Sequence, residues 1–305
     1  MSEGMRRAIV IDCDPGLDDT VALALAAASP ELAITAVTTV AGNTTIERVT
    51  DNALSACASL GLKSPVVAGS SRPLRLKAAY ATEVWGGTGS LGLKRPRRGA
   101  VSEPAFDYLA RTLRQAAEHS VLFCLLGPLT NLAQLLLKEP GLASKIDRLM
   151  IMGGALGKGN ATACAEFNIW FDPHAARLIF SSQIPTVVAP YDLTRNLLMT
   201  KPRLRRLARS TKPAAKLAAR MLALAGSGGH PAAIHDAAVI GCLIWPDLFS
   251  IERGLFTVET EDGPARGQTH FKAGEGHHVL LSGVDTDRLL DLMTDRLLSK
   301  PEKKQ

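Results

Sequence analysis

Residues 8–19 read AIVIDCDPGLDD, and they combine three signals of local structure. Its first four residues are aliphatic, as in a short buried strand, and Pro15-Gly16 marks a turn. The residues after the turn, 18–28, continue with an apolar pattern of helical length. Strand, turn and helix in this order predict the opening of a βαβ unit.

The same alternation of short apolar runs and longer helical patterns continues to residue 195. Because the strand-like runs are almost continuously apolar, they predict parallel strands that are covered on both faces. We therefore predict an α/β fold: a single domain over residues 1–305, with a central, mostly parallel, doubly wound sheet flanked by helices, plus a helical C-terminal region. The expected strands are residues 8–11, 33–40, 65–68, 121–126, 148–152 and 186–189, and the expected helices are residues 18–28, 45–60, 103–118, 129–138 and 173–181.

Past residue 195 the pattern changes. Residues 201–225 and 232–245 are helical in character, and two strand-like runs and a last amphipathic helix follow. That helix has an apolar stripe at three- and four-residue spacing, which predicts packing on the body of the domain. The stripe consists of Leu289, Leu290, Met293 and Leu297.

Composition and charge narrow the class of protein. With 46% apolar and 21% charged residues, the chain is typical of a soluble globular protein. The net charge of +6 arises mainly from residues 94–98 and 201–209, which lack interleaved aromatic residues. We interpret these runs as solvated surfaces and predict no nucleic-acid partner.

No membrane or secretory segment is predicted. The basic residues 1–7 precede only four apolar residues, too few for a secretory signal. The longest apolar stretch, 21–41, is interrupted by Ser29-Pro30-Glu31. The five cysteines form no CxxC pair, which suits a reducing compartment. We expect a cytoplasmic enzyme.

Four carboxylates lie within eight positions at the end of the first strand: Asp12, Asp14, Asp18 and Asp19. One of the last two could cap the following helix, but four mutually repelling carboxylates are costly unless a cation or a positively charged transition state is nearby. Ligands in open α/β sheets bind beyond the carboxyl ends of the strands, where this cluster falls. Hard oxygen ligands favour Ca²⁺ or Mg²⁺.

The chain resembles the inosine-uridine-preferring nucleoside hydrolase family, whose opening motif is DxDPGxDD. Further motifs follow in the order of that family and fall at predicted strand ends or loops. They are Thr39-Val40-Ala41-Gly42-Asn43, Leu126-Gly127-Pro128-Leu129-Thr130-Asn131, Met152-Gly153-Gly154, Ala165-Glu166-Phe167-Asn168, Asp172-Pro173 and His235-Asp236.

This resemblance implies hydrolysis of the N-glycosidic bond of a ribonucleoside through an oxocarbenium-like transition state. It implies a Ca²⁺ ion bound by Asp14, Asp19, the main-chain carbonyl of Thr130 and Asp236, with Asp14 as general base on a bound water. The ribose hydroxyls would be held by Asp18, Asn43, Asn160, Glu166 and Asn168.

The resemblance leaves more than one role for three further positions. His235 is the candidate proton donor to the leaving base, or a structural residue at a helix start. Trp85 stands where many family members carry a His-Gly pair, and its ring could stack on the base. Asp12 is assigned a supporting role, to orient the metal ligands or the loop.

Alternatives remain at this point. One is hydrolysis of a related N-ribosyl compound, and another is a catalytically silent nucleoside-binding protein. A phosphatase of the haloacid dehalogenase type is disfavoured, since Gly16 stands where that family expects Thr or Val. The resemblance implies a homodimer or homotetramer and leaves the preferred base open.

Overall fold

The computed structural model describes residues 6–81, 89–96 and 98–299. The opening motif forms strand β1 (Arg7–Cys13) and helix α1 (Leu17–Ala28), as the sequence predicts. The helix starts at the turn because Pro15 and Gly16 end the strand, and Asp19 accepts a hydrogen bond from the Gly16 N–H.

Among the described residues, nine strands form one sheet in the order β3-β2-β1-β4-β5-β6-β9-β7-β8. The strands from β3 to β9 in that order run parallel, and β7 runs antiparallel to both of its neighbours. The remaining strands are β2 (Leu32–Thr39), β3 (Val66–Ala68), β4 (Val121–Leu125), β5 (Ile146–Met152), β6 (Thr186–Ala189), β7 (Phe249–Val258), β8 (Thr269–Ala273) and β9 (His278–Val284).

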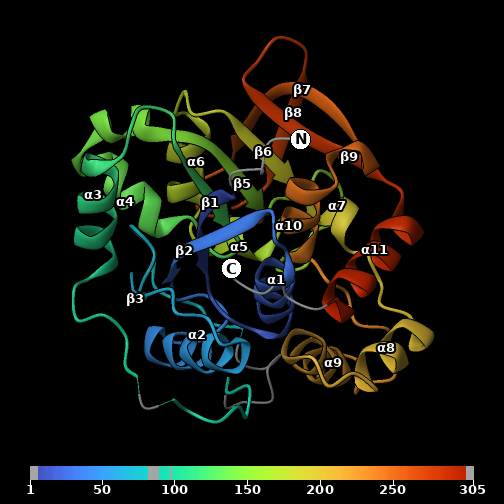
Figure 1. Ribbon diagram of the computed structural model, residues 1–305. Helices are drawn as coiled ribbons and strands as arrows, with labels where there is room; N and C mark the ends of the chain where they lie inside the picture. Colours follow the sequence, from blue (N-terminus) through green and yellow to red (C-terminus); the bar gives the residue numbers. More distant parts are fainter. Residues whose placement is uncertain (1–5, 82–88, 97, 300–305) are drawn as a thin grey trace, which may run out of the picture.

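Helices cover both faces of the sheet, so the predicted α/β doubly wound fold is confirmed (Figure 1). Alternate residues of β1 divide between the two cores: Ile9 and Ile11 enter one, and Val10 enters the other. The first core lies under α2 (Ile46–Leu60), α9 (Pro213–Ala225), α10 (Ala237–Ile244) and α11 (Thr286–Leu298), together with α1; the second lies under α3 (Ala105–Gln115), α4 (Thr130–Lys138) and α6 (Pro173–Phe180).

Shorter helices complete the chain. They are α5 (Phe167–Phe171), α7 (Tyr191–Thr194), α8 (Lys201–Ala208), and the 3₁₀ turns Pro140–Lys145 and Pro246–Leu248.

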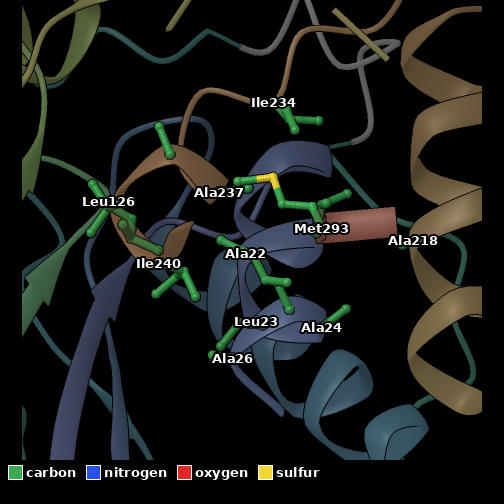
Figure 2. Close-up of a cluster of buried hydrophobic side chains, with 14 of the residues drawn as sticks. Ala22, Leu23, Ala24, Ala26, Leu126, Ala218, Ile234, Ala237, Ile240 and Met293 are labelled. Atoms are coloured by element: carbon green, nitrogen blue, oxygen red, sulfur yellow. The ribbon is translucent and has the colours of Figure 1, made fainter. Parts of the chain in front are cut away.

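Helix α1 is buried on nearly all sides, which explains its almost uniformly apolar sequence. It packs against α9, α10 and α11, and Figure 2 shows Ala22 and Ala24 of α1 near Ala218, Ala237 and Met293 of these helices. Small residues allow the helices to approach closely. The helix that begins at the carboxylate cluster is therefore held firmly in the core.

The C-terminal region is less helical than predicted. Three strands, β7, β8 and β9, extend the sheet where two strand-like runs are expected. Strand β8 is a short edge strand with polar residues, such as His270 and Lys272, so no continuous apolar run marks it in the sequence. The helical segment 201–225 is two helices, because Pro213 cannot continue the hydrogen-bond ladder of α8.

The basic runs are partly neutralised by neighbouring carboxylates. Arg203 contacts Asp287 and Asp291 at 3.0 and 2.7 Å, and Arg206 contacts Asp295 at 2.6 Å, which joins α8 to α11. This arrangement agrees with the interpretation of residues 201–209 as a solvated face. Within the described ranges, none of the helices is both long and apolar enough to cross a bilayer.

Candidate active site

A cavity of about 700 Å³ opens at the carboxyl ends of β1, β2, β4 and β5. Its lining brings together polar residues that are up to 222 positions apart in the sequence, from Asp14 to Asp236. The predicted site residues among them are Asp14, Asp18, Asp19, Asn43, Asn160, Glu166, Asn168, His235 and Asp236.

Asp14 lies at the floor of the cavity and is 1% exposed. The Asn43 N–H donates to Asp14 Oδ2 at 2.6 Å. A Cβ atom on Gly42 would lie 2.3 Å from Asp14 Oδ2, and one on Gly127 would lie 2.5 Å from Oδ1. The carboxylate is thus held between two backbone segments that only glycine allows to come so close.

Asp18, Asp19 and Asp236 each offer a carboxylate oxygen within 4.8 Å of the others. Asp19 is buried at the first turn of α1, and its Oδ1 also accepts from the Asp14 N–H at 3.2 Å. Asp236 directly precedes α10 and is 3% exposed. The starts of two neighbouring helices, α1 and α10, therefore bring these carboxylates together.

Burial and mutual repulsion raise the pKa values of this cluster. Desolvation, then the charge of Asp18, raises the pKa of Asp19 to about 7. Desolvation is also the main cause that raises the pKa of Asp14 and of Asp236 well above the ordinary value, with neighbouring carboxylates adding to it. A bound cation would relieve both effects. The all-oxygen donor set fits a hard cation such as Ca²⁺ or Mg²⁺.

The polar residues that line the cavity form its floor, and Glu166 and Asn168 belong to this floor. Glu166 caps α5 and accepts hydrogen bonds from the N–H groups of Gly154, Asn168 and Ile169 at 3.0, 3.0 and 3.3 Å. Burial raises its pKa to about 7 in spite of these bonds. The Asn168 amide donates to the main-chain carbonyls of Leu126 and Met152 at 2.9 and 3.2 Å.

Asn160 lies on a tight loop at the rim of the cavity. Its Oδ1 accepts from the Phe167 N–H at 2.8 Å, and the residue is exposed. The side chain is therefore oriented by its own loop while it remains open to a ligand.

His235, the residue directly before Asp236, also lines the cavity. Its Nδ1 is 3.0 Å from Thr194 Oγ1, and its ring lies 5.5 Å from that of Tyr191, centroid to centroid. Burial lowers the pKa of His235, and the charge of Asp18 opposes this shift. The residue makes the structural hydrogen bond of the alternative interpretation, and it also lines the cavity.

Two predicted residues lie apart from the cavity lining. Asp12 is buried behind it, where its Oδ1 accepts from Thr38 and, at 2.7 Å, from Asn131. Thr130 starts α4, and its hydroxyl donates to Asp172 at 2.7 Å. Leu126, four residues before Thr130, does line the cavity, and its carbonyl accepts from the Asn168 amide at 2.9 Å.

Trp85 lies outside the described residues. The hypothesis that it stacks on the base is therefore carried forward only as a prediction.

The upper wall of the cavity was not predicted. It is mainly apolar and comes from loops and from the end of α9. Met152 and Phe167 lie within motifs of the family, and Ser227 and Gly228 lie in a glycine-rich run that could be a plain loop or an active-site lid, whereas the other residues had no clear signal in the sequence. The wall consists of Ala81, Met152, Phe167, Tyr191, Leu224, Ala225, Ser227, Gly228, Pro231, Ala232 and Ala233.

Comparison with known families agrees with this geometry. Residues 9–291 match the family model described as inosine-uridine preferring nucleoside hydrolase. The pyrimidine-specific ribonucleoside hydrolase RihB of Escherichia coli O9:H4 (strain HS) is 36% identical over 274 residues, which is 87% of each chain.

Solved structures give the same result. A plant nucleoside hydrolase, PpNRh1, superposes with a TM-score of 0.86 at 29% identity and covers 97% of this chain and 100% of its own. A purine-preferring ribonucleoside hydrolase from Gardnerella vaginalis has a TM-score of 0.86 at 26% identity and covers 95% of this chain and 98% of its own.

Proposed function

The chain belongs to the inosine-uridine preferring nucleoside hydrolase family and cleaves the N-glycosidic bond of nucleosides, and from this premise we propose how its residues divide the work. Water would be added across the bond between ribose and base, with Ca²⁺ as cofactor and Asp14 as general base. The observation that carries the proposal is the single cavity that unites Asp14 and the carboxylates of Asp19 and Asp236 with Asn43, Glu166 and Asn168.

Asp14, Asp19 and Asp236 would hold the cation, together with a main-chain carbonyl. The resemblance assigns that carbonyl to Thr130, but Leu126 takes its place in the proposal because Leu126 lines the cavity and Thr130 does not. Asp18 belongs to the same carboxylate group, and we assign it to the sugar. When bound, Ca²⁺ would orient the ribose hydroxyls and make a bound water more acidic.

Asp14 would accept the proton of the attacking water. A carboxylate is a competent base once it is ionised, and a cation beside it lowers the raised pKa toward that state. Its two oxygens are fixed by the Asn43 N–H and by the glycine backbones, so the water would meet a single orientation of the base.

The ribose would lie over the polar floor. Asp18, Asn43, Asn160, Glu166 and Asn168 would accept or donate hydrogen bonds to its hydroxyls. The nearby carboxylates would also stabilise positive charge as it develops on the ribosyl ring.

The base would enter the apolar upper wall. His235 would donate a proton to the departing base, with Tyr191 packed against its ring. Trp85 would add a stacking surface from the neighbouring loop. The named relatives differ, one pyrimidine-specific and one purine-preferring, so the base class has to be measured.

One alternative substrate remains inside this proposal, a related N-ribosyl compound. We also propose a homodimeric or homotetrameric assembly. Light scattering measures the assembly. The phosphatase alternative predicts cleavage of p-nitrophenyl phosphate, and we expect none.

The test is release of ribose and free base from inosine, adenosine, guanosine, uridine and cytidine, followed by chromatography. We expect release that EDTA abolishes and Ca²⁺ restores. Release that survives complete chelation would reject the cofactor assignment. Absence of release from all five nucleosides, by protein that binds Ca²⁺, would redirect the proposal to a modified N-ribosyl substrate.

A further inference from the structure

Asn131 is a buried amide that the proposed chemistry does not use. It is the second residue of α4, it is 4% exposed, and it does not line the cavity. Its Nδ2 donates to Asp12 Oδ1 at 2.7 Å and to the Thr39 carbonyl at 2.9 Å, and its Oδ1 accepts from the Ser70 N–H at 2.8 Å. One side chain thus joins β1, the end of β2 and the loop after β3.

These bonds fix the loop that follows β2. The loop is held at Thr39 by Asn131 directly, and two residues later the Ala41 N–H donates to the Ser70 carbonyl at 2.9 Å. Ser70 is itself held by Asn131. Both anchor points of the loop therefore depend on the same amide.

The same loop carries the partner of Asp14. The Asn43 N–H donates to Asp14 Oδ2 at 2.6 Å, and the Asn43 side-chain amide donates to the Asp14 carbonyl at 2.9 Å. Gly42 touches the carboxylate so closely that a shift of this loop cannot leave Asp14 in place. Small displacements matter, because about 1 Å of misplacement at a reacting group can lower a rate by ~10²-fold.

The packing around the amide is equally tight. A Cβ atom on Gly69 would lie 2.3 Å from Asn131 Oδ1, 2.4 Å from Nδ2 and 2.4 Å from the Thr39 carbonyl. The backbone therefore approaches the amide closely enough to hold it in one orientation. A methyl group at this position would disturb the hydrogen bond between Asn131 and Thr39 without replacing either residue.

We infer that Asn131 is a positioning residue: it sets the orientation of Asp14 through Thr39, Ser70 and the 39–43 loop. The inference rests on the proposed role of Asp14 as general base. A merely structural Asn131 would affect stability alone, whereas a positioning residue affects the step in which water attacks.

The experiment compares Asn131→Ala and Gly69→Ala with Leu297→Ala, which truncates a buried side chain of α11 far along the chain from the site. Turnover is measured well below the unfolding temperature, with the preferred nucleoside and with a p-nitrophenyl riboside, whose leaving group needs no proton. We expect kcat to fall about 10- to 100-fold on both substrates in the first two variants, with KM changed less than about threefold. Leu297→Ala should lose stability and keep kcat.

A second readout is independent of turnover. Hydrogen exchange of the peptide that covers residues 39–43 should accelerate in Asn131→Ala and Gly69→Ala and stay unchanged in Leu297→Ala. Unchanged exchange in this peptide, or a kcat loss matched by Leu297→Ala, would overturn the inference. If exchange accelerates while wild-type protein hydrolyses neither substrate, the loop linkage stands and the assignment of Asp14 as base fails.

Discussion

The floor and the upper wall of the cavity are built in opposite ways. The floor consists mainly of buried carboxylates and amides at strand ends and helix starts, and several of them are tied to main-chain groups, such as Asp14 to Asn43 and Glu166 to Gly154. The wall consists of small or apolar residues on loops and on the end of α9, including Leu224, which is 46% exposed. Several hydrogen bonds fix the side chains of the floor, whereas the wall is made mainly of apolar side chains on loops.

This difference assigns separate tasks to the two regions. The groups that we propose to act in water attack lie on the floor, where the sheet and α1 hold them. The contacts that we propose to select a base lie on loops, which can change without disturbing the floor. Relatives with the same fold but different base preference are what such a division produces.

The largest effect should come from the floor. Asp14→Ala removes the proposed base, and kcat should fall by about 10²- to 10⁴-fold while the circular dichroism spectrum stays unchanged. Asp192→Ala is the matched control, because Asp192 is a carboxylate that accepts from the N–H groups of Leu156 and Gly157 outside this cavity. Retained turnover in Asp14→Ala would remove the base from the proposal.

The next largest effect should come from metal removal, which should change the stability of floor and wall variants differently. Ca²⁺ should stabilise the wild-type protein by about 2.7 kcal/mol at a concentration of 100 Kd, because it binds the folded state only. Asp236→Asn should lose most of this stabilisation, as seen by thermal unfolding with and without EDTA. Leu224→Ala, a change in the wall, should keep it. Equal stabilisation of Asp236→Asn and wild type would move the cation site elsewhere.

The pH dependence of stability should trace the buried floor as well. Burial raises the pKa of Glu166 from 4.5 to about 7, so the folded state keeps this proton over a range in which the unfolded chain loses it. Glu166 therefore stabilises the metal-free protein below about pH 4.5, and that contribution is lost as the pH rises through 7. Glu166→Gln should flatten this decline in denaturant unfolding measured from pH 4.5 to 8. An unchanged slope would mean that Glu166 is ionised throughout.

Much of this floor could be predicted from the sequence, because its residues are fixed by local rules. The Asp-rich motif follows an apolar strand, and strand ends in a parallel sheet gather at one edge. The same reasoning could not tell that Leu126 lines the cavity whereas Thr130 does not, because this depends on where α4 begins. It could not find Leu224 or Ala225, because an apolar residue at a helix end has the same pattern whether it faces a core or a ligand.

The smallest effect should come from the wall. Leu224→Ala removes part of an apolar surface that the base would contact, and about 1 kcal/mol of lost contact corresponds to about a fivefold rise in KM for the preferred nucleoside. Turnover of a p-nitrophenyl riboside at saturation should not change, because the floor is intact. Leu137→Ala is the matched control, since this leucine is 58% exposed on α4, outside the active-site cavity.

The ratio of kcat/KM values for a purine and a pyrimidine nucleoside shows whether Leu224 contacts the base. If Leu224 contacts the base, its truncation should affect the larger and the smaller base unequally, because they reach different depths of the wall. A KM that rises equally for both nucleosides and for the p-nitrophenyl riboside would place the effect on the ribose. In that case the wall would not be the base-selecting region, and the division between rigid floor and variable wall would fail.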